Sequence, residues 1–177
     1  MKLYVRENYK NSREFAEICV RDYTGESNFT FAENKYGKPF VSGLENMHFS
    51  TSHSGNMIIC AVARHNIGAD CQIININDIA KCKKIAGRFY SPHENLFLDG
   101  LPAHKYISNF FEIWTKKEAY IKYTGRGLSE GLSSFTVDNI GGVCFKRVLP
   151  ELSGAYIYLC CGEENKKNRA DLRVEYI

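Results

Sequence analysis

The segment from Pro102 to Gly125 restricts the fold of this chain more than any other feature of its sequence. Proline is favoured in the first turn of a helix, and glycine just beyond the last turn. Between these residues, apolar side chains recur at three- and four-residue intervals: Ile107, Phe110, Phe111, Trp114 and Ile121. The segment therefore predicts one long helix whose apolar stripe faces the core.

Short apolar segments on both sides of this helix predict strands. Their spans are 4–5, 28–31, 48–53, 57–63, 67–74, 135–137, 143–148, 155–161 and 172–176. Turn signals stand at 36–39 and 54–56. Further helices are predicted at 12–20, with Ser12 as the cap, at 78–89, and from 91 onward. Short strands with interspersed helices indicate the α+β class.

The chain has 177 residues, which fits one compact unit or two small halves. Each side of residue 75 offers a helix and several strands. We therefore predict an N-terminal half at 1–75 and a C-terminal half at 76–177.

Composition narrows the classes of protein to consider. No window of 18 apolar residues occurs and the N-terminus lacks an apolar signal core, so we expect neither a membrane span nor a leader. The seven cysteines form no CxxC pair, which favours buried thiols in a reducing cytosol over a disulfide framework or a zinc site. A formal charge of +3 suits an anionic ligand or an acidic partner.

A carboxylate interrupts the apolar stripe of the long helix. Glu118 lies four residues after Trp114 and three before Ile121. Burial of a carboxylate is unfavourable unless a cation or hydrogen bonds satisfy it. Lys122 follows Glu118 by one turn, and Lys117 lies on the flank of the stripe. A functional carboxylate and an ordinary i,i+4 surface salt bridge both fit this pattern.

The predicted strand 67–74 also carries an unusual polar pair. Alternation puts Asp70 and Gln72 on one face of that strand. Aspartate is disfavoured inside strands, whereas oxygen-bearing side chains on one face suit a hard cation. An edge strand with a solvated face is the alternative.

The strand and turn at 49–56 contain hydroxyl groups, an imidazole and free backbone N–H groups. Ser52 and His53 could thus contact a phosphate, or could simply form a polar hairpin tip. Lys38, in the Gly37-Lys38-Pro39 turn, would add a positive charge unless it is only solvated.

In combination and order, these segments resemble the surfactin-synthetase type of 4'-phosphopantetheinyl transferase. The family pattern is a GKP turn, an SHS turn, a GxDxE strand and a WxxKEAxxKxxGxG helix end. The matching segments are Tyr36–Pro39, Phe49–Gly55, Ile67–Gln72, Arg88–Glu94 and Trp114–Gly127. The resemblance spans the region from residue 12 to residue 140, and the helix element is its most specific part.

The resemblance implies two similar α+β halves related by a pseudo-twofold axis, with the active site between them. It implies a cytoplasmic, monomeric transferase that moves phosphopantetheine from coenzyme A to a serine of an acidic apo carrier protein. The products are the holo carrier protein and adenosine 3',5'-bisphosphate. Fatty-acid, polyketide and peptide-synthetase carriers all fit, while membranes and nucleic acids are not expected partners.

The resemblance also implies roles for individual residues. Asp70 and Glu118 would hold Mg²⁺, or Mn²⁺, against the pyrophosphate of coenzyme A, with Glu118 as the base for the serine hydroxyl. Lys122 would neutralise charge on the pyrophosphate. The coenzyme A contacts would be Lys38, Ser52, His53, Asp70, Lys122 and Arg13.

The sequence departs from the family pattern in two ways. Gln72 replaces the second acid of GxDxE, so we expect weaker metal binding through an amide oxygen or a water, with activity retained. The region before the GKP turn is shorter than usual, which bears on coenzyme A affinity and on Arg13.

Two other functions must be weighed. A weakened relative that binds coenzyme A or a carrier protein without transfer is favoured by Gln72 but opposed by Asp70, Glu118 and Lys122. A nucleic-acid-binding domain is suggested by the basic pI and many aromatics, but no RNA-binding motif or zinc spacing supports it.

Overall fold

The computed structural model describes residues 1–74, 78–148, 154–166 and 171–177. Among them, the strands form three sheets. One has the order β4-β5-β1-β9, with bounds His48–Ser54, Met57–Ala63, Lys2–Glu7 and Arg173–Tyr176. The second has the order β6-β8-β7, with bounds Gly68–Ile73, Ala155–Gly162 and Val143–Val148. The third pairs β2 (Thr30–Glu33) with β3 (Pro39–Ser42).

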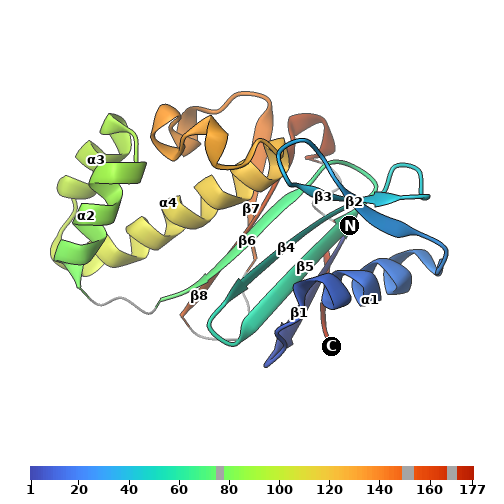
Figure 1. The fold of residues 1–177 in the computed structure, drawn as a ribbon. Coiled ribbons are helices and arrows are strands. Elements are labelled where there is room, and N and C mark those ends of the chain that lie inside the picture. Colours follow the sequence, from blue (N-terminus) through green and yellow to red (C-terminus); the bar gives the residue numbers. More distant parts are fainter. Residues whose placement is uncertain (75–77, 149–153, 167–170) are drawn as a thin grey trace.

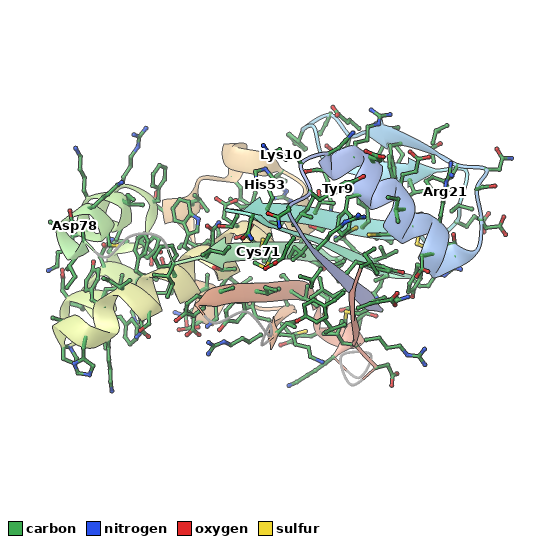
Figure 2. The ribbon with its side chains drawn as sticks, turned by 90° about the horizontal axis from the view of Figure 1, so that it is seen from below. Tyr9, Lys10, Arg21, His53, Cys71 and Asp78 are labelled. Atoms are coloured by element: carbon green, nitrogen blue, oxygen red, sulfur yellow. The ribbon has the colours of Figure 1, made fainter. Side chains whose placement is uncertain are left out.

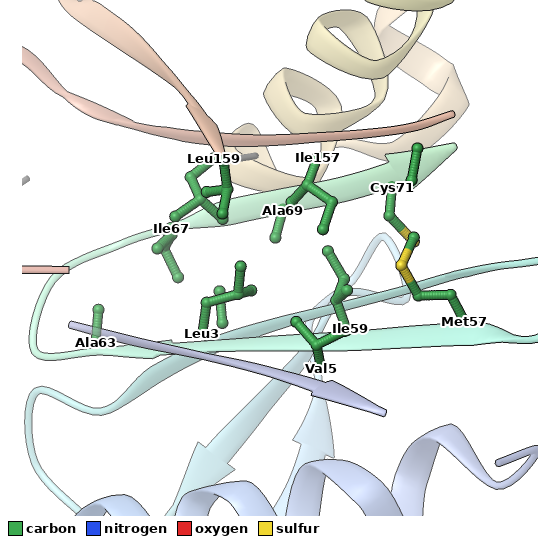
Figure 3. Close-up of a cluster of buried hydrophobic side chains, with 13 residues drawn as sticks. Leu3, Val5, Met57, Ile59, Ala63, Ile67, Ala69, Cys71, Ile157 and Leu159 are labelled. Carbon is green, nitrogen blue, oxygen red and sulfur yellow. The ribbon is translucent and has the colours of Figure 1, made fainter. Parts of the chain in front are cut away.

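The two larger sheets face each other across an apolar core. Leu3, Val5 and Ile59 project from the first sheet toward Ala69, Ile157 and Leu159 of the second (Figure 3). Helix α1 (Ser12–Thr24) covers the outer face of the first sheet. Helices α2 (Ile79–Phe89), α3 (Pro92–Asp99) and α4 (Ala103–Thr124) lie on the side of the second sheet (Figure 1). The α+β prediction is confirmed.

Strand β5 shows why this layering follows from the sequence. All seven of its residues are buried, because α1 covers one face and the second sheet covers the other. An apolar run without alternation is the pattern expected for a strand covered on both faces. The predicted strand 57–63 is therefore confirmed residue for residue.

The edges of the two larger sheets meet along β4 and β6, and serine side chains connect them. The N–H groups of Ala69 and Ile73 donate to Ser50 Oγ and Ser54 Oγ, each at 2.9 Å. Between them, Ser52 Oγ donates to the side chain of Asp70 at 2.6 Å. We call Ser50, Ser52 and Ser54 the serine seam. It satisfies edge groups that would otherwise lack a sheet partner.

The helix ends agree with the sequence-based predictions, with one correction. Helix α4 begins after Pro102 and ends at Gly125, which has φ +66°. Ser91 and Glu94 form a capping box at the start of α3. The cap of α1, however, is Asn11, whose side chain accepts from the N–H of Glu14, while Ser12 is the first helical residue.

The strand predicted at 135–137 is wrong. The chain there forms short 3₁₀ turns, Leu132–Ser134 and Val137–Asn139. Lys117 Nζ donates to the carbonyl oxygens of Leu132 and Phe135, at 2.7 and 2.6 Å. These side-chain contacts take the place of a strand ladder. Strand β3, by contrast, was not predicted, because its first residue belongs to the turn signal at 36–39.

Strand pairing crosses the predicted division at residue 75. Strand β6 precedes that division but pairs with β8, and β9 near the C-terminus pairs with β1 in parallel. The division into two halves and the pseudo-twofold relationship stay predictions. No helix in the described part of the chain is long and apolar enough to cross a lipid bilayer.

Candidate active site

Strand β6 and helix α4 approach each other closely at Gly68. A Cβ atom on Gly68 would overlap the carbonyl oxygen of Ala119 and the backbone nitrogen of Tyr123. Only glycine allows two backbones to approach this closely. The contact places Asp70, two residues after Gly68 on β6, next to Lys122, three residues after Ala119 on α4.

Asp70 is the centre of the resulting polar cluster. Only 2% of its surface is exposed. Its Oδ1 accepts from Ser52 Oγ at 2.6 Å and from Lys122 Nζ at 2.7 Å. Its Oδ2 accepts from Gln72 Nε2 at 3.2 Å. The buried carboxylate is thus satisfied by three donors from three different elements, one of them cationic.

Glu118 lies one turn before Lys122 on α4 and is half-buried. Burial raises the pKa of its carboxyl group, and the negative charge of Asp70 raises it further, while Lys122 acts in the opposite direction. The sequence also allowed a solvated salt bridge between Glu118 and Lys122. That alternative does not fit, because Glu118 is half-buried and Lys122 donates to Asp70. A second carboxylate near Asp70 makes the pair a candidate for holding a cation.

The donors present fit Mg²⁺ better than they fit a transition metal. Within the described ranges, no group of three or more His, Cys, Asp or Glu side chains could hold a metal by itself. Mg²⁺, however, is usually held by one or two carboxylates together with phosphates and waters. Asp70 and Glu118 could supply the carboxylates, and a cation between them would relieve the repulsion that, after burial, raises the pKa of Glu118.

The polar cluster opens into a cavity of about 420 Å³. Its lining residues are Ser12, Thr51, Ser52, His53, Asp70, Gln72 and Lys122. His53 is exposed on β4 and lies close to the start of α1 (Figure 2). Serine, imidazole and ammonium groups around one hollow are suited to bind phosphate oxygens.

A second cavity, of about 220 Å³, adjoins the first, and both are lined by Thr51 and Lys122. Lys38 lines this second cavity. Its ammonium donates to Asn66 Oδ1 at 3.0 Å and to the carbonyl oxygen of Tyr123 at 3.1 Å. The GKP turn is thereby fastened to the end of α4. Burial lowers the pKa of Lys38 to about 8.

Arg13 lines a third cavity, also of about 220 Å³, between α1 and the β2–β3 hairpin. This cavity shares Thr51 with both others and Ser12 with the polar one. The three hollows therefore adjoin one another, and together we call them the cleft. Every site residue named from the sequence lines this cleft, except Glu118, which lies beside it on α4.

Comparison with known proteins identifies the family of this chain. A sequence model of the 4'-phosphopantetheinyl transferase superfamily matches residues 66–166, which include Asp70, Glu118 and Lys122. The chain belongs to this superfamily. The match begins just before Gly68 and so contains the whole β6–α4 contact.

Individual transferases of the superfamily are similar over different lengths. The 4'-phosphopantetheinyl transferase gsp of Aneurinibacillus migulanus is 33% identical over 173 residues, covering 89% of this chain and 70% of gsp. A Bacillus subtilis transferase is 40% identical, covering 61% of this chain and 46% of its own length. The transferase psf-1 of Bacillus pumilus is 44% identical, covering 56% and 41%. The chain thus spans less than half the length of the last two relatives.

Two features of this superfamily member escaped sequence reasoning. Thr51 lines all three cavities, and its position two residues before His53, on the same face of β4, could have indicated this. Lys117 was placed on the flank of the helix stripe, but it is fully buried. The motif alone would suggest that Lys117 binds an anion, like Lys122. Its tertiary contacts, with Glu94 and the carbonyl oxygen of Leu132, show that its ammonium is bound inside the protein.

Proposed function

We propose that this chain transfers the 4'-phosphopantetheine group of coenzyme A to a serine of an apo carrier protein. The observation that carries the proposal is the convergence of three charged residues: Asp70 and Lys122 line the polar cavity and form an ion pair, and Glu118 lies beside them on α4. It is supported by membership of the transferase superfamily.

In this reaction the serine oxygen forms a bond to the phosphorus on the pantetheine side of the pyrophosphate. The bond from that phosphorus to the bridging oxygen breaks, and adenosine 3',5'-bisphosphate leaves with the electron pair. The serine proton passes to a base. Charge therefore accumulates on phosphate oxygens, where cationic groups lower the barrier most effectively.

The residues of the cleft suit these requirements. Lys122 projects an ammonium into the polar cavity and would stabilise charge on the leaving phosphate. A bound Mg²⁺ would supply further charge stabilisation, held by Asp70 and Glu118 with Gln72 beside them. The cleft is also lined by Ser52, His53, Lys38 and Arg13, which would orient the phosphates of coenzyme A.

Glu118 is the candidate base for the serine proton, directly or through a water. Burial and the neighbouring Asp70 raise the pKa of its carboxyl group. A carboxylate with a raised pKa is a stronger base than a solvent-exposed one. Its place beside the cleft, rather than in the network around Asp70, leaves it near an incoming hydroxyl.

The carrier protein, location and assembly are part of the same proposal. Carrier proteins are acidic around the modified serine, and a chain with formal charge +3 attracts an acidic partner. We propose a monomeric enzyme, because the cleft is formed by elements of one chain, and a cytoplasmic one, because all seven cysteines are free and buried. Fatty-acid, polyketide and peptide-synthetase carriers are all candidate substrates.

A weakened relative that binds without transfer is the second candidate, and Gln72 favours it. Gln72 turns its Nε2 toward Asp70, where the family pattern has a carboxylate. The site therefore has one negative charge fewer for a metal.

The deciding experiment is intact-mass analysis of an apo carrier protein incubated with the chain, coenzyme A and Mg²⁺. We expect the mass to rise by one phosphopantetheine, and the rise to disappear without metal or with Glu118→Ala. Glu112→Ala is the matched control, because Glu112 lies on the same helix and pairs with Lys116 outside the cleft. No mass increase with any class of carrier, while coenzyme A still binds, would favour the weakened relative.

A further inference from the structure

Glu94 and Lys117 form an ion pair in the interior of the molecule, away from the cleft. Lys117 Nζ lies 2.8 Å from Glu94 Oε2, and the two side chains are 0% and 4% exposed. Lys117 stands immediately before Glu118 in the sequence. No step of the proposed reaction uses either charged group.

The hydrogen-bonding capacity of the ammonium group is fully used. Its three protons are matched by Glu94 Oε2 and by the carbonyl oxygens of Leu132 and Phe135. The ring of Phe135 lies 4.3 Å from the same nitrogen. Lys117 is therefore not available to bind a phosphate, although it belongs to the same sequence motif as Lys122.

The carboxylate is equally well satisfied. Glu94 Oε2 also accepts from the N–H of Ser91 at 2.8 Å, and Oε1 accepts from the N–H of Val137 at 3.0 Å. The pair thus joins the start of α3, the last turns of α4 and the segment 132–137. A buried pair with every partner in place holds one geometry, because each alternative leaves charge unpaired.

The helix wheel of α4 shows what this pair fixes. Successive residues are rotated by about 100°, so Glu118 and Lys122 lie between Lys117 on one side and Ala119 with Tyr123 on the other. Ala119 and Tyr123 contact Gly68 of β6 through their backbones. Two anchors therefore flank the pair of site residues: the ion pair and the glycine contact.

We propose that Glu94 and Lys117 are positioning residues, which set the rotation of α4 and so the place of Glu118 in the cleft. This inference rests on the proposed transferase function. Displacement of a reacting group by about 1 Å can cost roughly a hundredfold in rate, so a rotated α4 should slow transfer without abolishing coenzyme A binding.

The test uses the paired variant Glu94→Gln/Lys117→Met, because neutralising both partners avoids a lone buried charge. We expect a folded protein whose kcat for transfer falls about tenfold or more, with a KM for coenzyme A within about threefold of wild type. The matched control is Glu112→Gln/Lys116→Met. It removes the neighbouring, partly exposed ion pair of α4, 2.9 Å long, and should leave both constants unchanged.

A folded paired variant with wild-type kcat would overturn the inference and leave only a stabilising role. If the paired variant does not fold, the same constants and limits apply to Glu94→Asp, which keeps both charges but shortens the side chain that holds Lys117. If the wild-type chain transfers nothing, the proposed transferase function itself is refuted. This outcome differs from loss of the positioning role alone, in which the wild-type chain is active and the paired variant is equally active.

Discussion

Gly68 of β6 lies directly against Ala119 of α4, with no room for a side chain between the two backbones. This contact explains why a glycine precedes Asp70 by two residues. The close approach of β6 to α4 places Asp70 next to Glu118 and Lys122. The distance between Lys122 Nζ and Asp70 Oδ1, 2.7 Å, depends on it.

Gly68→Ala should therefore damage both stability and activity. The added methyl group forces β6 and α4 apart, which we expect to lower the free energy of unfolding by about 1–3 kcal/mol and the transfer rate by roughly a hundredfold. Urea unfolding and the carrier-protein assay measure the two effects. Gly87→Ala is the control, since no atom lies within 4 Å of its added methyl group, and stability there should be unchanged or rise by about 0.5–1 kcal/mol.

Substitutions at Gln72 should change metal affinity in opposite directions. Gln72→Glu adds a carboxylate beside Asp70, so half-maximal activity should be reached at several-fold lower Mg²⁺. Gln72→Ala removes the amide and should require more Mg²⁺. The measurement is the Mg²⁺ dependence of the transfer rate. Unchanged Mg²⁺ dependence in Gln72→Ala, together with loss of turnover in Gln72→Glu, would contradict this role.

Lys38 should make coenzyme A binding dependent on pH. Burial lowers the pKa of Lys38 to about 8, so its positive charge is present below that pH and lost above it. The KM for coenzyme A should consequently rise between about pH 7 and pH 9. Lys38→Arg keeps its charge throughout this range. A rise of the same size in Lys38→Arg would show that another group is responsible.

Ser52→Ala and Ser54→Ala should separate the two tasks of the serine seam. Each loses one hydrogen bond between β4 and β6, so each should lose about 1 kcal/mol of stability or somewhat more. Of these two serines, Ser52 is the one that donates to Asp70 Oδ1. Ser52→Ala should therefore also alter the Mg²⁺ dependence of transfer, whereas Ser54→Ala should not. Equal Mg²⁺ curves for both variants would confine Ser52 to stability.

Local signals in the sequence determined much of the secondary structure. The ends of α4, the capping box of α3 and the buried strand β5 all depend on neighbouring residues, whose preferences act without tertiary partners. The same is true of the motifs that indicated a transferase. These motifs are defined by residue types and spacing along the chain, so they can be recognised without three-dimensional information.

The tertiary structure decided which of these residues meet. Periodicity predicted that Glu118 lies in a buried stripe, but not that Asp70 is its neighbour, because strand and helix are 48 residues apart at these positions. Lys117 and Glu118 are adjacent in the motif, yet one lies in a sealed ion pair and the other beside the cleft. The strand predicted at 135–137 was wrong for the same reason: long-range partners, Lys117 and Glu94, satisfy that backbone and override its local preference.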